Sequence, residues 1–238
     1  MVKQNTTIIY ENTVAGTFVR RMNRFTAEVL IDGAPQIVHV KNTGRLQELL
    51  MPEAKVTLQK TLNPNRKTAY DLISVYKPKL KWVNIDSLAP NALMKQLYMS
   101  LNYDLVKAEH TYGDSRIDFY MEKNGEKFLT EVKGCTLADD LHPGIGLFPD
   151  APTERGVKHL HELTKAAKEG CHTAIAFVIQ MNGIHRVLPN ETAQTEFKKA
   201  LVEAAKAGVQ VVCYSCHVEA DSIKITGVIE DTSRFLNM

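Results

Sequence analysis

Apolar and polar residues alternate along the first 80 positions of the chain with the two-residue period of β-strands. Residues 44–50 fit one short helix, which Pro52 would stop. Three strands, a helix and two more strands is the order of an OB-type barrel, a five-stranded design that often binds oligonucleotides. The predicted strands span residues 13–21, 24–32, 36–40, 55–61 and 68–76.

From about Trp82 onward the pattern changes to that of an α/β domain. We therefore predict an α+β chain of two domains, with an OB-like β-barrel over residues 1–82 and an α/β domain with a mixed sheet over residues 83–238. Helical spacing of apolar residues predicts helices over 92–101, 153–169 and 192–207, and strands are expected over 106–112, 115–122, 126–133, 173–180 and 209–218.

A hairpin is predicted where an Asn-Gly pair at residues 124–125 separates two alternating runs. In the register of a two-residue loop, Asp118 lies opposite Glu131 and Arg116 lies opposite Lys133. The alternation directs these four charged side chains to one face of the hairpin. It directs the apolar side chains to the other, core-facing side: Ile117, Phe119, Met121, Phe128 and Val132.

Two carboxylates that face each other across paired strands repel and need a compensating charge. Mg²⁺ or Mn²⁺ would supply it, because hard cations prefer carboxylate oxygens and retain waters. Asp118 and Glu131 are thus candidate metal ligands, Glu109 is a candidate third, and Lys133 can steady a water or a phosphate. This set suits metal-assisted phosphodiester hydrolysis. The alternative is a surface ion-pair ladder in which Arg116 and Lys133 balance the two acids.

The helix predicted at 153–169 presents polar residues at helical spacing, among them Arg155, Lys158 or His159, and Glu162. A cationic helix face beside a carboxylate site suits a phosphate substrate. Alternatively, His159 and the nearby His161 are ordinary surface histidines. The expected buried stripe of this helix consists of Val157, Leu160, Leu163 and Ala167.

Charge is distributed unevenly along the chain. Residues 1–90 contain 13 Lys/Arg and 7 Asp/Glu, whereas the remainder contains 16 Lys/Arg and 20 Asp/Glu. A basic half suits contact with a phosphate backbone, and the alternative is an ordinary solvated surface. The candidate nucleic-acid contacts are Arg20, Arg21, Arg24, Arg45, Arg66 and Lys67, together with Arg155, Lys158 and His159 of the helix.

Other features narrow the class of protein. Cys213 and Cys216 form a CxxC, but on a strand the two side chains point to opposite faces, so we interpret them as structural and not as zinc ligands. No apolar run approaches the ~18 residues of a membrane span, and the N-terminus has no signal-peptide pattern. We expect a cytoplasmic protein without a membrane partner.

Five segments carry a resemblance to a known family: NTGRL (42–46), RKTAYDL (66–72), SRIDF (115–119), EVKG (131–134) and FPDAPTERGVKHLHEL (148–163). In this order and spacing, they resemble the sugar fermentation stimulation protein A family.

The resemblance implies an N-terminal OB-like domain and a C-terminal domain similar to PD-(D/E)XK nucleases. It also implies an active site of Asp118, Glu131 and Lys133, although no proline precedes Asp118 as in the fuller motif of that superfamily.

The family is described as DNA-binding, which makes DNA the expected partner. Three hypotheses follow: a DNA-binding protein with a Mg²⁺-dependent nuclease-type centre, a non-catalytic DNA-binding regulator of sugar metabolism, and a protein that binds or cleaves RNA.

Overall fold

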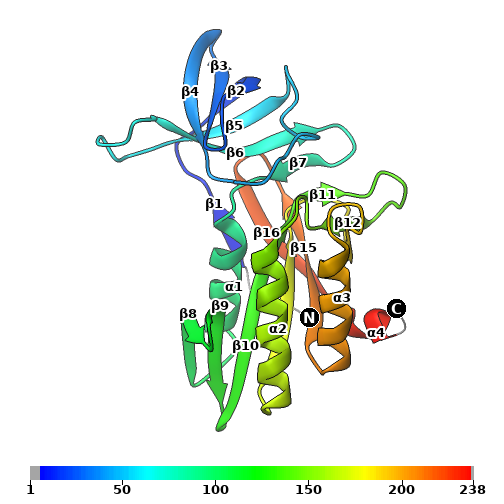
Figure 1. Cartoon of the computed structure of the whole chain (residues 1–238). Coiled ribbons are helices and arrows are strands. Elements are labelled where there is room, and N and C mark those ends of the chain that lie inside the picture. The colour runs from blue at the N-terminus through cyan, green and yellow to red at the C-terminus, as the bar shows by residue number, and fades with distance from the viewer. Residues whose placement is uncertain (1–5, 237–238) are drawn as a thin grey trace.

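The alternating first part of the chain forms a closed barrel of five strands, at the top of Figure 1. The computed structural model of the protein describes residues 6–236. Neighbouring strands pair antiparallel in the order β4-β3-β2-β5-β6, and a parallel pairing of β4 with β6 closes the ring. The predicted OB-like barrel is confirmed. Its strands are β2 (Thr13–Arg21), β3 (Thr26–Ile31), β4 (Ala34–Val40), β5 (Lys55–Lys60) and β6 (Tyr70–Lys77).

The helix predicted at 44–50 is wrong. Leu46 has a φ of 50°, in the left-handed region that a right-handed helix cannot continue through. A single turn follows, in which the Leu50 N–H donates to the Leu46 carbonyl at 2.8 Å. Because Leu46, Leu49 and Leu50 are all buried, the segment contributes to the barrel core as an irregular loop.

The second domain is built on a seven-stranded mixed sheet in the order β1-β16-β15-β13-β10-β9-β8. The central strands β10, β13 and β15 are parallel, and the others are antiparallel to their neighbours. The predicted mixed sheet is confirmed. The strands are β1 (Thr7–Ile9), β8 (Leu105–Tyr112), β9 (Ser115–Lys123), β10 (Glu126–Cys135), β13 (His172–Ile179), β15 (Gln210–Val218) and β16 (Ser222–Glu230).

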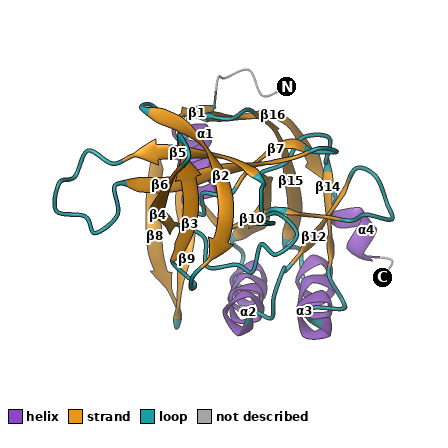
Figure 2. Cartoon of the chain, turned by 90° about the horizontal axis from the view of Figure 1, so that it is seen from above, coloured by secondary structure: helices purple, strands orange, loops and turns teal. Residues whose placement is uncertain are grey.

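Helices cover both faces of this sheet, with α2 and α3 on one side and α1 on the other (Figure 2). Central parallel strands joined by helical crossovers need such cover on both faces. The helices are α1 (Ala89–Met99), α2 (Glu154–Lys168), α3 (Thr195–Lys206) and the short α4 (Thr232–Leu236). The remaining strands are β7 (Lys81–Asn84), which extends the barrel sheet, and β11 (Leu137–Ala138), β12 (Ile145–Phe148) and β14 (Arg186–Pro189), which form a small separate sheet.

Because helices cover both faces of the sheet, the β9–β10 hairpin has no single core face. The expectation that its apolar residues share one core-facing side is therefore wrong. Phe119, Met121 and Val132 pack on the α1 side, whereas Ile117 belongs to the cluster under α2 and α3. The β8–β9 ladder skips one residue on each strand just before Phe119, and this irregularity reverses the alternation. The two cysteines of the CxxC do lie on opposite faces, Cys213 in one cluster and Cys216 in the other.

The first strand of the chain and a buried polar network connect the two domains. Strand β1 pairs with β16 of the second domain's sheet, so the chain enters this sheet before it forms the barrel. Asn84 donates to the Tyr10 hydroxyl at 3.1 Å and accepts from Gln180 Nε2 at 2.8 Å. Lys41 of the barrel pairs with Asp86 at 2.7 Å. These contacts fix the barrel against the start of α1 and the end of β13.

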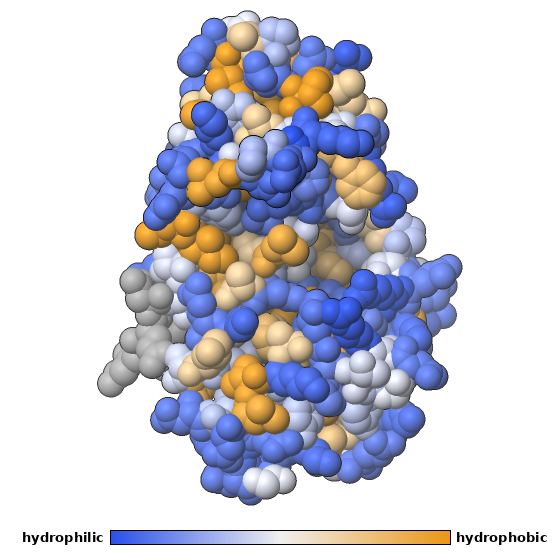
Figure 3. All heavy atoms as spheres, turned by 90° about the vertical axis from the view of Figure 1, so that its left-hand side faces the viewer, coloured by the Kyte–Doolittle hydropathy of each residue, from blue (hydrophilic) through white to orange (hydrophobic). Residues whose placement is uncertain are grey.

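The surface is predominantly hydrophilic. On the face shown in Figure 3, apolar side chains occur in small groups between hydrophilic ones. Within residues 6–236, no helix has both the length and the apolar character needed to cross a membrane. Residues 1–5, which begin the segment without a signal-peptide pattern, and residues 237–238 lie outside the described chain.

Candidate active site

The predicted hairpin register is confirmed at the loop end of the hairpin. Both residues at 124–125 have positive φ, 53° and 82°, as the turn favoured by twisted strands requires. Lys123 pairs with Glu126, and the ladder continues to Phe119 and Thr130. The register thus brings the following residues, Asp118 and Glu131, to the same end of the strand pair.

The carboxylate of Asp118 continues the pairing where the backbone ladder stops. Its Oδ2 accepts the Val132 N–H at 2.8 Å, and its Oδ1 accepts from Asn91 Nδ2 at 2.9 Å. Asn91 lies in the first turn of α1, which begins with Ala89-Pro90. Two donors from different elements therefore hold the Asp118 carboxylate in one orientation.

Glu131 is almost completely buried, with 2% of its surface exposed. Its Oε1 accepts from Lys133 Nζ at 2.6 Å and bonds His159 Nδ1. Its Oε2 is buried and has no hydrogen-bond partner in the structure. A buried carboxylate oxygen without a partner is costly, and such an atom needs an explanation.

The two acids have opposite shifts in pKa. Burial, and then the charge of Glu131, raise the pKa of Asp118 above its ordinary value. Burial also acts to raise the pKa of Glu131, but the hydrogen bond from His159 and the charge of Lys133 outweigh it and lower that pKa. Glu131 is therefore held in its ionised form. Its neighbour Asp118 is less readily ionised, because burial disfavours the charged form.

Helix α2 positions His159 over Glu131. The helix starts at Thr153, whose Oγ1 accepts the Gly156 N–H at 2.9 Å in an N-cap. Arg155 Nε lies 3.4 Å from His159 Nε2. If Arg155 donates to Nε2, the Nδ1–H of His159 is left to donate to Glu131. The interpretation of His159 as a surface residue is wrong, because it is 4% exposed and lies in the buried stripe of α2.

Glu109 does not join this group. It has a φ of 57°, and the β8–β9 ladder skips Glu109 and Asp118 between paired neighbours. Its carboxylate is exposed and pairs with Arg116. Of the alternative ion-pair ladder, in which Arg116 and Lys133 balance Asp118 and Glu131, only the pair of Lys133 with Glu131 is present, because Arg116 pairs with Glu109. Among residues 6–236, no three His, Cys, Asp or Glu side chains form a cluster that could hold a metal ion.

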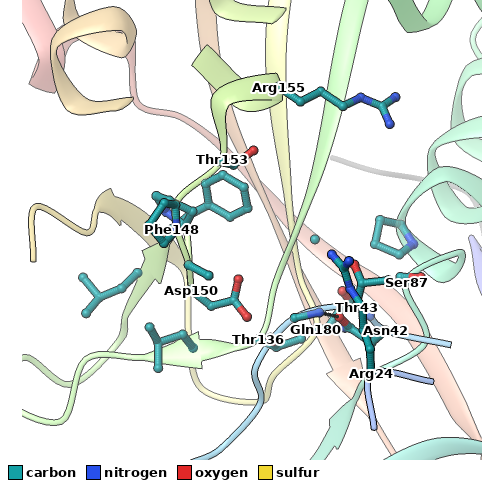
Figure 4. Close-up of a pocket in the computed structure, with 18 residues that line it drawn as sticks. Arg24, Asn42, Thr43, Ser87, Thr136, Phe148, Asp150, Thr153, Arg155 and Gln180 are labelled. Atoms are coloured by element: carbon teal, nitrogen blue, oxygen red, sulfur yellow. Dashed lines mark hydrogen bonds between the residues drawn. The ribbon is translucent and has the colours of Figure 1, made fainter. Parts of the chain in front are cut away.

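A cleft of about 480 Å³ lies between the barrel and the second domain (Figure 4), and Gly134, the neighbour of Lys133 in β10, lines it. Arg155 links the cleft to the carboxylate of Glu131, because it lines the cleft and contacts His159, which bonds Glu131. The cleft is closed on one side by Asp150, whose carboxylate accepts the Arg45 N–H at 3.1 Å. Its lining comes from the barrel (Arg24, Asn42–Gly44), the start of α1 (Ser87, Pro90), the end of β10 and β13 (Gly134, Thr136, Gln180) and the segment from Leu147 to Arg155.

Comparison with known proteins places the chain in a family. A family model described as the SfsA N-terminal OB domain matches residues 19–85. A second, described as the sugar fermentation stimulation protein RE domain, matches residues 85–222. The chain belongs to the sugar fermentation stimulation protein family. The resemblance inferred from the five sequence segments is confirmed.

Relatives in this family match the chain over nearly its whole length. The sugar fermentation stimulation protein homolog of Ruminiclostridium cellulolyticum is 46% identical over 225 residues, which cover 93% of this chain and 98% of the relative. That of Desulfitobacterium hafniense strain Y51 is 46% identical over 220 residues, or 90% and 94%. The structure of Pyrococcus furiosus SfsA in complex with Ca²⁺ has a TM-score of 0.82 at 25% identity, covering 93% of this chain and 96% of that one.

In this member of the family, three of the predicted phosphate contacts are engaged within the barrel. Arg20 pairs with Glu28 at 2.7 Å. Arg66 forms two hydrogen bonds with Asp71, at 2.7 and 2.9 Å. Arg21 donates to backbone carbonyls of the loops around it, including that of residue 44 at 2.6 Å.

Apart from His159, which is buried and bonds Glu131, the remaining candidates lie on the surface or in the cleft. Arg24 and Arg155 both line the cleft. Arg45 and Lys67 have exposed side chains, and Lys158 donates to the backbone carbonyl of residue 114 at 2.8 Å. The basic residues expected to act together are thus divided among structural pairs, two cleft arginines and exposed positions outside the cleft.

Sequence reasoning did not identify Asn91 or Gln180 as parts of this region. The signal for Asn91 was present, because Pro90 marks a helix start and places the next residue in the first turn. Gln180 had no such signal, since a glutamine at the end of an apolar strand has many ordinary roles.

Proposed function

We propose that the protein is a nucleic-acid-binding, metal-dependent phosphodiesterase of the nuclease type. Its second domain would be similar to PD-(D/E)XK nucleases, with Asp118, Glu131 and Lys133 as the catalytic residues and DNA as the expected substrate. The observation that carries the proposal is the buried, unpartnered Oε2 of Glu131 beside a second carboxylate and a lysine.

The two acids fit a divalent cation. Mg²⁺ in nucleotide and polynucleotide sites is held by one or two carboxylates, with waters and substrate phosphates as the other ligands. Asp118 and Glu131 would therefore be sufficient protein ligands for Mg²⁺ or Mn²⁺. The related Pyrococcus furiosus protein, whose structure is in complex with Ca²⁺, supports the presence of a hard-cation site in this fold.

A bound cation would act as a Lewis acid on the phosphoryl group and lower the pKa of a bound water. The chain's own residues supply the rest. His159 and Lys133 hold Glu131 in its ionised form, and Asn91 and the Val132 N–H orient Asp118. The ammonium group of Lys133 can neutralise a non-bridging phosphate oxygen or orient the attacking water.

A non-catalytic DNA-binding regulator is the second candidate. The excess of Lys and Arg in residues 1–90 and the OB barrel favour binding irrespective of catalysis. The two candidates differ at Lys133. The regulator predicts that Lys133→Ala leaves both binding and the cellular effect intact, whereas the nuclease predicts lost cleavage with retained binding.

Calorimetric titration of Mg²⁺ and Mn²⁺ tests the cation site. We expect saturable binding to the wild type and its loss in Asp118→Asn/Glu131→Gln. Glu109→Gln is the matched control, because its exposed carboxylate pairs with Arg116 and should leave the titration unchanged.

Cleavage is then assayed with labelled single- and double-stranded DNA and RNA in the presence of either metal. We expect Lys133→Ala to lower the rate about 10²-fold or more. Absence of cation binding in the wild type, even with DNA present, would refute the catalytic proposal.

A further inference from the structure

The interdomain cleft is lined by cationic, aromatic and helix N-terminal groups suited to a nucleotide, and by one carboxylate, Asp150, which accepts the Arg45 N–H. Arg24 comes from the barrel and Arg155 from α2, so cationic groups of both domains line it (Figure 4). Thr153, at the N-cap of the 15-residue helix α2, also lines it, and a helix N-terminus favours a phosphate. Arg20 and Arg66 are held by acidic partners, whereas the side chain of Arg24 is exposed at the cleft.

An aromatic ring in the cleft is suited to contact with a base. Phe148 lines the cleft and is partly exposed. Its ring is held in place by Phe177 and Phe197, with ring centroids 5.6 and 5.1 Å away. Stacking of bases on a fixed aromatic ring is typical of sites that bind single strands without sequence preference.

The size of the cleft selects against a duplex. A volume of about 480 Å³ falls in the range of pockets that enclose one drug-sized ligand, roughly 300–1,000 Å³. A paired, stacked base cannot enter such a pocket unless it is first extruded from the helix, which costs a few kcal/mol. An unpaired base does not meet this cost.

We infer that the interdomain cleft binds one unpaired nucleotide, and that the substrate is single-stranded nucleic acid. This inference rests on the proposed function and names its substrate class. Arg24 and Arg155 contact the phosphates, and Phe148 contacts the base. Arg155 also contacts His159, which bonds Glu131, so two side chains, those of Arg155 and His159, link the cleft to this catalytic carboxylate.

Binding is tested by fluorescence anisotropy in EDTA, where no cleavage takes place. The probes are a labelled oligothymidylate, an oligouridylate of equal length and a blunt DNA duplex of that length. We expect the wild type to bind single strands about tenfold more tightly than the duplex. Comparison of the affinities for oligothymidylate and oligouridylate shows whether the protein prefers single-stranded DNA or RNA.

Two cleft variants and one control accompany the wild type. Arg24→Ala removes one phosphate contact, and should weaken binding and lower the salt slope of log K for the single strand by about 0.7. Thr43→Glu places a negative charge at an exposed position of the cleft, where it would repel a phosphate, and should weaken binding about tenfold. Lys60→Ala removes an exposed barrel lysine that does not line the cleft, and should have no effect.

Equal affinity for duplex and single strand, or wild-type binding by both cleft variants, would overturn the inference. Cleavage that needs Asp118 and Glu131 would still support the proposed function in that case. Conversely, cleft-dependent binding of single strands without metal-dependent cleavage would support the inference and refute the catalytic proposal.

Discussion

Asp118 and Glu131 show how two neighbouring acids acquire different properties from their surroundings. The Glu131 carboxylate is hydrogen-bonded to Lys133 and His159. The Asp118 carboxylate accepts hydrogen bonds only from neutral donors, the Asn91 amide and the Val132 N–H. The carboxylate that is held charged thus lies beside one whose charge is disfavoured. Such a pair stores unfavourable electrostatic energy that a cation would release.

Asp118→Asn should be at least as stable as the wild type in metal-free buffer at pH 7. The folded-state pKa of Asp118 lies above its ordinary value of 3.8, so its ionisation above that range costs stability. Asparagine removes this cost and keeps an acceptor for the Val132 N–H. Urea unfolding measures the effect, and the advantage of Asn should shrink as the pH falls towards 3.8.

Asp118→Ala is the matched variant, because it removes both the charge and the acceptor. It should lose about 1–3 kcal/mol of unfolding free energy, the usual cost of a buried donor without a partner. Equal destabilisation by Asn and Ala would show that charge at this position carries no electrostatic cost.

Arg66 was expected to contact phosphate, and its pairing with Asp71 predicts a structural role instead. Arg66→Ala should lower the unfolding free energy by about 1–3 kcal/mol at pH 7. Burial acts to raise the pKa of Asp71, but hydrogen bonds from Arg66 and His39 and the charge of Lys41 lower it below 3.8. The stabilisation is therefore present above pH 3.8 and is lost as the pH falls below it.

Urea unfolding of this variant at pH 7 and at acidic pH measures both effects. Lys67→Ala, at the exposed neighbouring position, should change stability by no more than about 0.5 kcal/mol. A loss in Arg66→Ala that persists unchanged at low pH would contradict the assigned ion pair.

The close contact between β10 and α1 depends on a glycine in β10, Gly134, because any side chain there would meet α1. A Cβ at Gly134 would lie 2.9 Å from Pro90 Cγ and would collide with Gln180 Oε1. Gly134→Ala should therefore displace the start of α1, which carries Asn91, and cost about 1–3 kcal/mol. Thermal unfolding measures the cost, and calorimetry with Mg²⁺ measures the effect on Asp118.

Gly227→Ala in β16 is the control for this substitution. Its Cβ would meet only Ser215 atoms at 3.8 and 3.9 Å, an ordinary contact. We expect little change in stability. Equal effects of the two substitutions would show that the close approach at Gly134 is not a constraint.

Elements with strong local signals were predictable from sequence, and those set by tertiary contacts were not. The Asn-Gly turn has its own backbone preference, so the hairpin register followed from it. Strand β1 depends on pairing with β16, at the other end of the chain, whereas β16 itself pairs with β15 along most of its length. The burial of His159, which overturns the alternative of a surface histidine, was not predictable because it depends on Glu131, a partner 28 residues away.

At the level of the whole molecule, the buried network at Asn84 predicts that the two domains unfold together. Trp82, the only tryptophan, lies in β7 near this network and reports on it by fluorescence. The fluorescence and far-UV circular dichroism transitions should coincide in the wild type. Asn84→Ala should lower both midpoints, with a loss of about 1–3 kcal/mol in the free energy of unfolding, because it leaves buried polar groups unpaired.

The control is Asn63→Ala, at an exposed position in the loop between β5 and β6, which should leave both transitions in place. Separate transitions in the wild type would contradict the coupling.

The two-domain order was predictable from the change in residue pattern near Trp82. The cleft was not, because its lining comes from six separate segments that only the domain packing brings together.

The pairing of β1 with β16 has a consequence for aggregation. The Thr7 to Ile9 segment occupies the backbone groups on the outer side of β16, at the end of a seven-stranded sheet. Without this short cap, β16 would present an open edge, and open edges recruit strands from other molecules. Removal of residues 1–9, which keeps Tyr10 for its hydrogen bond with Asn84, should therefore cause the protein to self-associate through its sheets.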